Sequence, residues 1–92
     1  MSVEDTLAER EITYGDFGMG TKAEAEFIDL VVKTHSAQRG SNTLDSVHIV
    51  WFSKIIMKLV RLSITPTHID SWHDIAGYAT LVEKELKNAK SE

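Results

Sequence analysis

Residues 44–62 constrain the fold of this chain most strongly, because they are apolar almost all the way round a helix. The apolar positions of this segment are Val47, Ile49, Val50, Trp51, Phe52, Ile55, Ile56, Met57, Leu59, Val60 and Leu62. A helix of this kind is buried on most of its sides. The rest of a chain of 92 residues can hardly cover it. We therefore expect a second subunit, in a homodimer or a higher oligomer.

The sequence before this segment predicts a short helix and a glycine-rich connector. Ser2 can cap a helix over residues 3–11. The glycines of residues 13–20 should then end it, since each glycine inside a helix costs about 1 kcal/mol relative to alanine. We expect Tyr14 and Phe17 to anchor this connector on the core.

Two more helices are indicated by apolar residues at helical spacing. One is predicted over 22–37, with Gly40 as its C-cap. The apolar central segment would follow it, capped by Asn42 or Thr43.

The last helix follows a short linker. It begins at Pro66 with Thr65 as its N-cap, or after Thr67 as the N-cap. The tail, residues 87–92, is expected to fray.

These elements predict one all-α domain over residues 1–92, a small four-helix bundle. Residues 2–20 supply its short helix and glycine-rich connector. The linker between the third and fourth helices is short, which favours an antiparallel hairpin at the centre of the bundle.

Charge and composition argue against several classes of partner. The formal net charge of -4 argues against a nucleic-acid surface, which needs clustered Lys and Arg, and against an anionic membrane surface. No apolar run approaches the roughly 20 residues that span a bilayer. The lack of cysteine leaves no thiolate metal site, and it fits a reducing cytoplasm.

The third predicted helix carries a cationic stripe. Lys54, Lys58 and Arg61 follow the spacing i, i+4, i+7 and so share one face, which Trp51 begins. In an antiparallel hairpin this stripe faces the helix that follows.

The fourth predicted helix carries an anionic stripe at matching spacing. Asp70, Asp74 and Tyr78 are spaced i, i+4, i+8. The hairpin should fold Arg61 back toward Asp70 and Lys58 toward Asp74. It should also bring the first lysine of the cationic stripe to the level of Tyr78–Leu81.

Three interpretations of these stripes remain open. They can form an ion-pair ladder that holds the hairpin in register. The cations can instead receive an anion such as a phosphate. The two aspartates can also hold a divalent metal, although nearby cations oppose this, and we expect no metal site.

The histidines do not form a metal-binding or catalytic set in the sequence. His68 and His73 are five residues apart, about 140° around a helix, unlike the i, i+4 pair of a zinc helix. Trp72 and Tyr78 are expected to be core or interface anchors. Gly77 should allow close helix–helix approach, or leave room for a ligand beside Asp74.

Two motifs give the chain a family resemblance. Residues 9–17, Glu-Arg-Glu-Ile-Thr-Tyr-Gly-Asp-Phe, are similar to an Arg-x-x-x-Tyr-Gly-Asp opening that includes Tyr14 and Asp16. Lys-x-x-Arg at 58–61 is coupled to Asp-x-Trp-x-Asp-Ile-Ala-Gly-Tyr at 70–78. Together they resemble a small domain family of unknown function found mainly in bacteriophage and prophage genomes.

This resemblance spans about residues 9–86 and implies an all-helical phage accessory protein of the host cytoplasm, without assigning an activity. The pattern shows a fainter similarity to MazG-like nucleotide pyrophosphohydrolases. Those are helical, oligomeric enzymes with Glu-x-x-Glu followed by Glu-x-x-Asp for Mg²⁺. Here the cationic stripe stands where acids would be needed, and only Asp70 and Asp74 resemble the second motif.

The sequence therefore predicts a non-catalytic accessory or regulatory protein that binds a host protein or a nucleotide-like anion, with no cofactor. Its candidate binding residues are Lys54, Lys58, Arg61, Asp70, Asp74 and Tyr78. Its candidate structural or interface residues are Trp51, Trp72, Gly77, Tyr14 and Asp16. The alternative is a divergent MazG-like pyrophosphohydrolase that uses Asp70 and Asp74, with Lys58 and Arg61 contacting phosphates.

Overall fold

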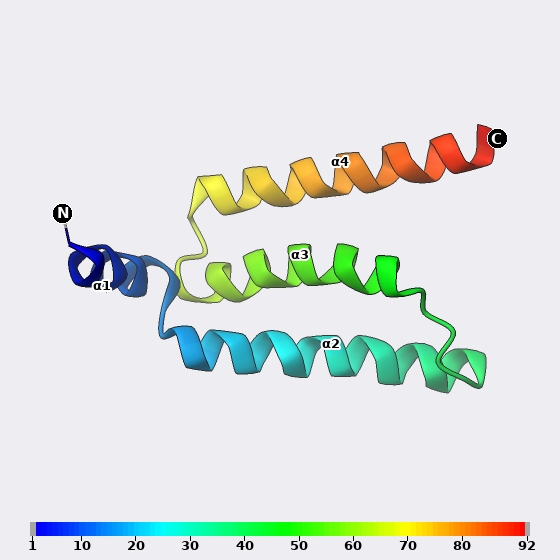
Figure 1. Cartoon of the computed structure of the whole chain (residues 1–92), viewed down its shortest axis with the longest axis horizontal. Helices are drawn as coiled ribbons and strands as arrows, with labels where there is room; N and C mark the ends of the chain where they lie inside the picture. Colours follow the sequence, from blue (N-terminus) through cyan, green and yellow to red (C-terminus); the bar gives the residue numbers. More distant parts are fainter. Residues whose placement is uncertain (1, 92) are drawn as a thin grey trace.

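The apolar third helix lies in the middle of the molecule (Figure 1). The computed structural model describes residues 2–91. Its helices are α1 (Val3–Tyr14), α2 (Phe17–Arg39), α3 (Ser46–Ile64) and α4 (Ile69–Ser91). Residues 2–91 contain no strand, so the predicted all-α class is confirmed. Within the same residues, no helix is both long and apolar enough to cross a membrane.

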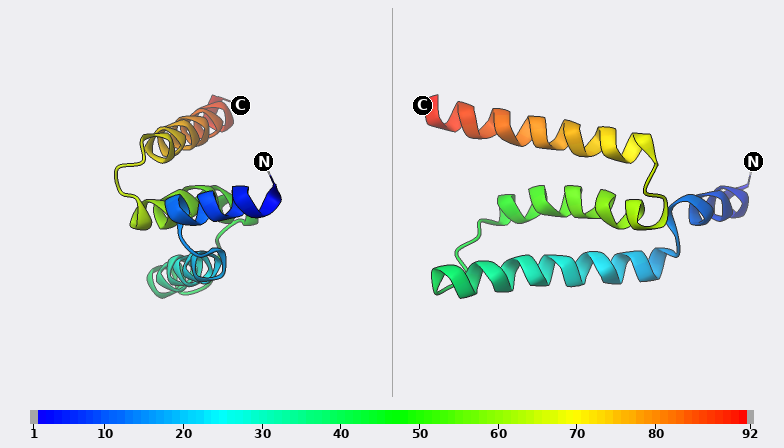
Figure 2. Two further views of the ribbon diagram at one scale, coloured as in Figure 1. Left: turned by 90° about the vertical axis from the view of Figure 1, so that its left-hand side faces the viewer. Right: turned by 180° about the vertical axis from the view of Figure 1, so that it is seen from behind.

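The three long helices lie side by side in one layer. Successive helices run antiparallel, and α3 separates α2 from α4 (Figures 1 and 2). The shorter α1 crosses one end of α3 with its axis turned out of the layer (Figure 2). Helix α3 packs against all three others. The predicted central hairpin of the third and fourth helices is confirmed.

This layered arrangement leaves the bundle open. Because α2 and α4 flank α3 from opposite sides, neither covers the two broad faces of the layer. Among the described residues, only Ile56, Lys58, Leu62 and Ser71 are buried. The apolar residues of α3 are therefore only partly covered within one chain.

The junction between α1 and α2 is much shorter than the predicted connector. One glycine makes the turn, since Gly15 adopts φ 81° and donates its N–H to the Glu11 carbonyl over 2.7 Å. Asp16 then caps α2, and its Oδ2 accepts the Met19 N–H over 2.9 Å. The predicted glycine-rich connector over 13–20 is therefore wrong.

Helix α2 instead includes two of the glycines in its first turn, Gly18 and Gly20. The Asp16 cap and the long helix that follows offset their cost. Phe17 does not anchor on the core as expected, because its side chain is 87% exposed.

Two of the caps expected from the sequence for the first three helices are confirmed. Ser2 caps α1, and its Oγ accepts the Asp5 N–H over 3.1 Å. Gly40 ends α2 in the left-handed conformation. The expected caps of α3 were wrong, because Asp45 fills that position and accepts the Val47 N–H over 2.8 Å.

Helix α4 is bounded differently from the prediction at both ends. It begins at Ile69, after a turn at Pro66 and Thr67, so neither expected N-cap is used. It continues to Ser91, through 87–91 of the tail expected to fray, and residue 92 lies outside the described residues. Thr65 instead links the hairpin to α1, because its Oγ1 donates to the Thr13 carbonyl over 2.6 Å.

Candidate functional site: the charged residues of the hairpin and the Tyr14 cluster

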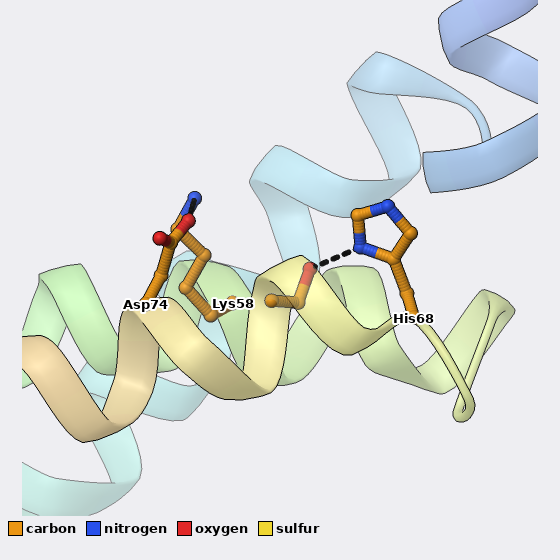
Figure 3. A network of polar contacts seen from close by, with 4 residues as sticks. Lys58, His68 and Asp74 are labelled. Atoms are coloured by element: carbon orange, nitrogen blue, oxygen red, sulfur yellow. Dashed lines mark hydrogen bonds and ion pairs between the residues drawn. The ribbon is translucent and has the colours of Figure 1, made fainter.

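The hairpin contains one of the expected ion pairs. Lys58 Nζ lies 2.9 Å from Asp74 Oδ2 (Figure 3). Lys58 is only 8% exposed, so its ammonium needs this partner to offset lost hydration. The predicted contact between these two residues is confirmed, and it accounts for the lysine as a structural group.

The same contact changes the acidity of the carboxyl group. The hydrogen bond from Lys58 holds the pKa of Asp74 below its ordinary value of 3.8, with further lowering by the charges of Lys58, His73 and Arg61. Partial desolvation opposes this shift. Asp74 is therefore held in its ionised form.

Lys54 occupies the expected level of the hairpin. Its Nζ lies 5.7 Å from the centre of the Tyr78 ring. The ammonium and the ring are thus within range of a cation–π interaction, of about 0.5–1 kcal/mol at an exposed site. The predicted register of α3 against α4 is confirmed here too.

Arg61 does not meet Asp70, and this part of the predicted ladder is wrong. The Arg61 guanidinium carbon lies 4.5 Å from the centre of the Tyr14 ring. Asp70 is exposed in the first turn of α4 and forms no ion pair with another described residue. The Tyr14 ring takes the place of Asp70 beside Arg61, because α1 brings Tyr14 to the same end of α3.

Tyr14 is the centre of a cluster that joins α1, α3 and the start of α4. The Arg10 guanidinium carbon lies 5.1 Å from its ring centre. The His68 ring meets it edge-on at 5.5 Å. His68 is itself fixed by a 2.8 Å contact between its Nδ1 and Ser71 Oγ (Figure 3). We call Arg10, Tyr14, Arg61 and His68 the Tyr14 cluster.

A cavity of about 480 Å³ opens beside this cluster, between α1, the start of α2 and α3. Its walls include Arg10, Tyr14 and Arg61, together with three acidic residues, Glu11, Asp16 and Glu24. Its size falls within the roughly 300–1,000 Å³ of small-molecule sites. The cavity combines two cations, an aromatic ring and hydrogen-bond acceptors.

Sequence reasoning missed Arg10 as a site residue. The available signal was its i, i+4 spacing to Tyr14, which puts both on one face of a helix. A first helix that ends at residue 11 leaves Tyr14 in a connector, where this spacing has no structural meaning. The observed α1 continues to Tyr14.

Both tryptophans lie away from the Tyr14 cavity. Trp51 lines a separate groove between α3 and α4, and its ring centre lies 5.0 Å from that of His48. Trp72 is half exposed and donates its Nε1–H to the Pro66 carbonyl over 2.8 Å. Trp72 therefore fixes the linker and is not a core residue.

Gly77 does not mark a close helix contact within the chain. A Cβ atom placed there would meet no heavy atom within 4 Å. The expected close approach is therefore wrong for a single chain. Among the residues described, no group of three or more His, Asp or Glu side chains could hold a metal ion.

The comparisons with known proteins give a family but no activity. A family profile described as a domain of unknown function, DUF6378, matches residues 4–86. Neither the curated proteins nor the solved structures contain a match. The matched region takes in the Tyr14 cluster and the hairpin ion pair. The chain belongs to the DUF6378 family of domains of unknown function.

Proposed function

We propose that this domain binds a phosphate-bearing, nucleotide-like anion, without transforming it, in the cavity beside the Tyr14 cluster. The observation that carries the proposal is the convergence of two guanidinium groups on one ring. Arg10 and Arg61 lie 5.1 and 4.5 Å from the Tyr14 centre. Among residues 2–90, neither has an ion-pair partner.

The geometry leaves these arginines able to bind. A guanidinium has five N–H donors in its plane and no acceptor. Contact with an aromatic ring occupies the region over the ring face, and it does not satisfy those donors. Arg61 is half buried, so it has also lost part of its hydration. A phosphate can accept two parallel N–H bonds from such a group.

The acidic residues of the cavity favour a nucleotide over bare phosphate. Glu11, Asp16 and Glu24 line the same space, and Asp16 already caps α2. They would repel an isolated phosphate, but they can accept hydrogen bonds from sugar hydroxyls or base amino groups. Opposite signs in one cavity therefore suit a ligand with a charged end and a hydrogen-bonding end.

The biological setting of the proposal rests on the motif resemblance. The Tyr-Gly-Asp opening and the Asp-x-Trp-x-Asp-Ile-Ala-Gly-Tyr segment support a phage-type accessory protein of the host cytoplasm. Binding of a nucleotide would then be regulatory. A host-protein target, the other expectation from the sequence, would bind without filling this cavity.

Calorimetric titration of the purified protein with nucleoside triphosphates, their deoxy forms and pyrophosphate tests the proposal. Sulfate at equal ionic strength controls for charge alone. We expect saturable nucleotide binding that Arg61→Met weakens at least about tenfold, since a charge-assisted hydrogen bond contributes about 1.5–3 kcal/mol. Arg39→Met is the matched control, because Arg39 is exposed at the far end of α2.

Three outcomes would overturn the proposal. The first is the absence of binding by any nucleotide, and the second is equal weakening by Arg39→Met. The third is release of pyrophosphate in the presence of Mg²⁺. If Asp74→Asn abolished that release, the divergent pyrophosphohydrolase would replace the binding protein.

A further inference from the structure

The chain exposes far more surface than a compact monomer of its size. Its accessible surface is 7084 Å² for 10.3 kDa. The scaling for folded monomers gives about 5,400 Å² at this mass. Its radius of gyration is 15.9 Å, against about 12 Å for a compact chain of this length. One chain therefore leaves exposed about 1,700 Å² of surface that a compact fold would cover.

Part of this surface is an apolar groove between α3 and α4. The groove has a volume of about 370 Å³, and its apolar walls include Phe52, Ile55, Val82 and Leu86. Phe52 and Leu86 are 40% and 48% exposed. Three charged residues of α4, Glu83, Lys87 and Lys90, line the groove as well. Its apolar walls are thus residues suited to a core that stay partly exposed within one chain.

Helix α4 extends the apolar surface as a regular stripe. Its positions are Trp72, Ile75, Ala79, Val82, Leu86 and Ala89. The spacing alternates between three and four residues, which is the seam of a helix that packs against a partner helix. Helix α3 repeats the pattern at Phe52, Ile55 and Leu59, and Leu62, which continues it, is already buried within the chain. Within one chain, α3 covers only one edge of the α4 stripe, because Trp72 and Leu86 remain half exposed.

We propose that a second copy of this chain covers this groove, so that two α3–α4 hairpins form the core of a homodimer. Two seams of the same period are self-complementary, as a twofold interface requires. The excess of about 1,700 Å² matches the 1,000–2,500 Å² that each partner buries in an obligate dimer. The near absence of buried apolar residues in one chain then has a physical reason.

This interface is independent of the proposed anion site. Phe52 and Arg61 are nine residues apart on α3, about 180° around the helix. The groove and the Tyr14 cavity also share no lining residue. The dimer therefore leaves the cavity open, and either proposal can fail without the other.

Two leucines of α4 provide a matched test. Leu86 lines the groove, whereas Leu81 is 60% exposed and lies about 140° away around the helix. Sedimentation equilibrium at micromolar concentration should give twice 10.3 kDa for the wild type and for Leu81→Lys. Leu86→Lys should weaken dimerisation at least about 100-fold, because it places a charge in the apolar seam.

A second measurement covers the case in which the separated chain unfolds. The thermal midpoint of the wild type should rise with protein concentration, as it does when folding is linked to association. A wild-type monomer mass with a concentration-independent midpoint would overturn the proposal. Dissociation by Leu81→Lys but not by Leu86→Lys would do the same, because it would place the interface on the opposite face.

Discussion

Lys58 Nζ lies 2.9 Å from Asp74 Oδ2, yet only the lysine is buried, with side-chain exposures of 11% and 44%. The two partners therefore differ in what their loss leaves behind. Removal of the carboxylate leaves an ammonium where water scarcely reaches. Removal of the lysine leaves a carboxylate that solvent already hydrates. The free energy of unfolding should respond unequally to substitution at the two ends.

We expect Asp74→Asn to lower the urea midpoint of unfolding more than Lys58→Met does. In the double mutant the lysine charge is absent, so the asparagine leaves no buried ammonium without a partner. The combined loss should be smaller than the sum of the single losses. Equal single losses that add would show that the two side chains do not stabilise each other in solution.

The ion pair should also make stability depend on pH in the acid range. The pKa of Asp74 is lowered in the folded chain, so the unfolded chain binds this proton more readily. The stabilisation is complete above the ordinary value of 3.8, and it is lost as the pH falls through the lowered folded pKa. Urea titrations between pH 6 and pH 2 should show this loss.

Substitution of either residue of the ion pair is the control for this pH dependence. Asp74→Asn lacks the titrating group, and Lys58→Met lacks the donor that lowers its pKa most. Each variant should lose less stability on acidification than the wild type. An identical acid response in all three proteins would contradict the role of this pair.

Two glycines should respond in opposite ways to the same substitution. Gly77 lies inside α4 with open space where a Cβ would be placed, so Gly77→Ala should stabilise the protein by about 1 kcal/mol. Gly15 has φ +81°, and its Cβ would lie 2.8 Å from Ile64 Cγ1. Gly15→Ala should destabilise by more than about 1 kcal/mol. Thermal unfolding of both variants gives the comparison.

The hairpin could be predicted from the sequence because its information is local. The short linker and the i, i+4 charge stripes fixed the antiparallel register, and both Lys58–Asp74 and Lys54–Tyr78 meet as expected. The glycine-rich connector could not be predicted in the same way. Summed helix propensities penalise Gly18 and Gly20, but they do not include the cap that Asp16 supplies.

The Tyr14 cluster could not be predicted because it depends on a long-range contact. Within the hairpin alone, Arg61 has Asp70 as its natural partner. Only the observed path of α1 across the end of α3 brings a ring to this arginine. The open layer of three helices could not be predicted from the sequence either. Apolar periodicity shows which side of a helix is covered, but it does not show whether the covering helix belongs to the same chain.

The attachment of α1 gives a final prediction, because one hydrogen bond ties its end to the hairpin. Thr65 Oγ1 donates to the Thr13 carbonyl across 52 residues of sequence, at a partly buried site. Thr65→Val keeps the side-chain shape but removes the donor, and it should destabilise the protein by about 1 kcal/mol.

The loss should be concentrated in α1. Amide hydrogen exchange over Val3–Tyr14 should become faster in Thr65→Val, while exchange in the centre of α3 changes little. Thr80→Val is the matched control, since the Thr80 hydroxyl donates only to the Ala76 carbonyl of its own helix. Equal acceleration of α1 exchange by both variants would show that this hydrogen bond does not hold α1 in place. If α1 does loosen, Tyr14 and Arg10 move away from Arg61, and nucleotide binding should weaken together with α1 protection.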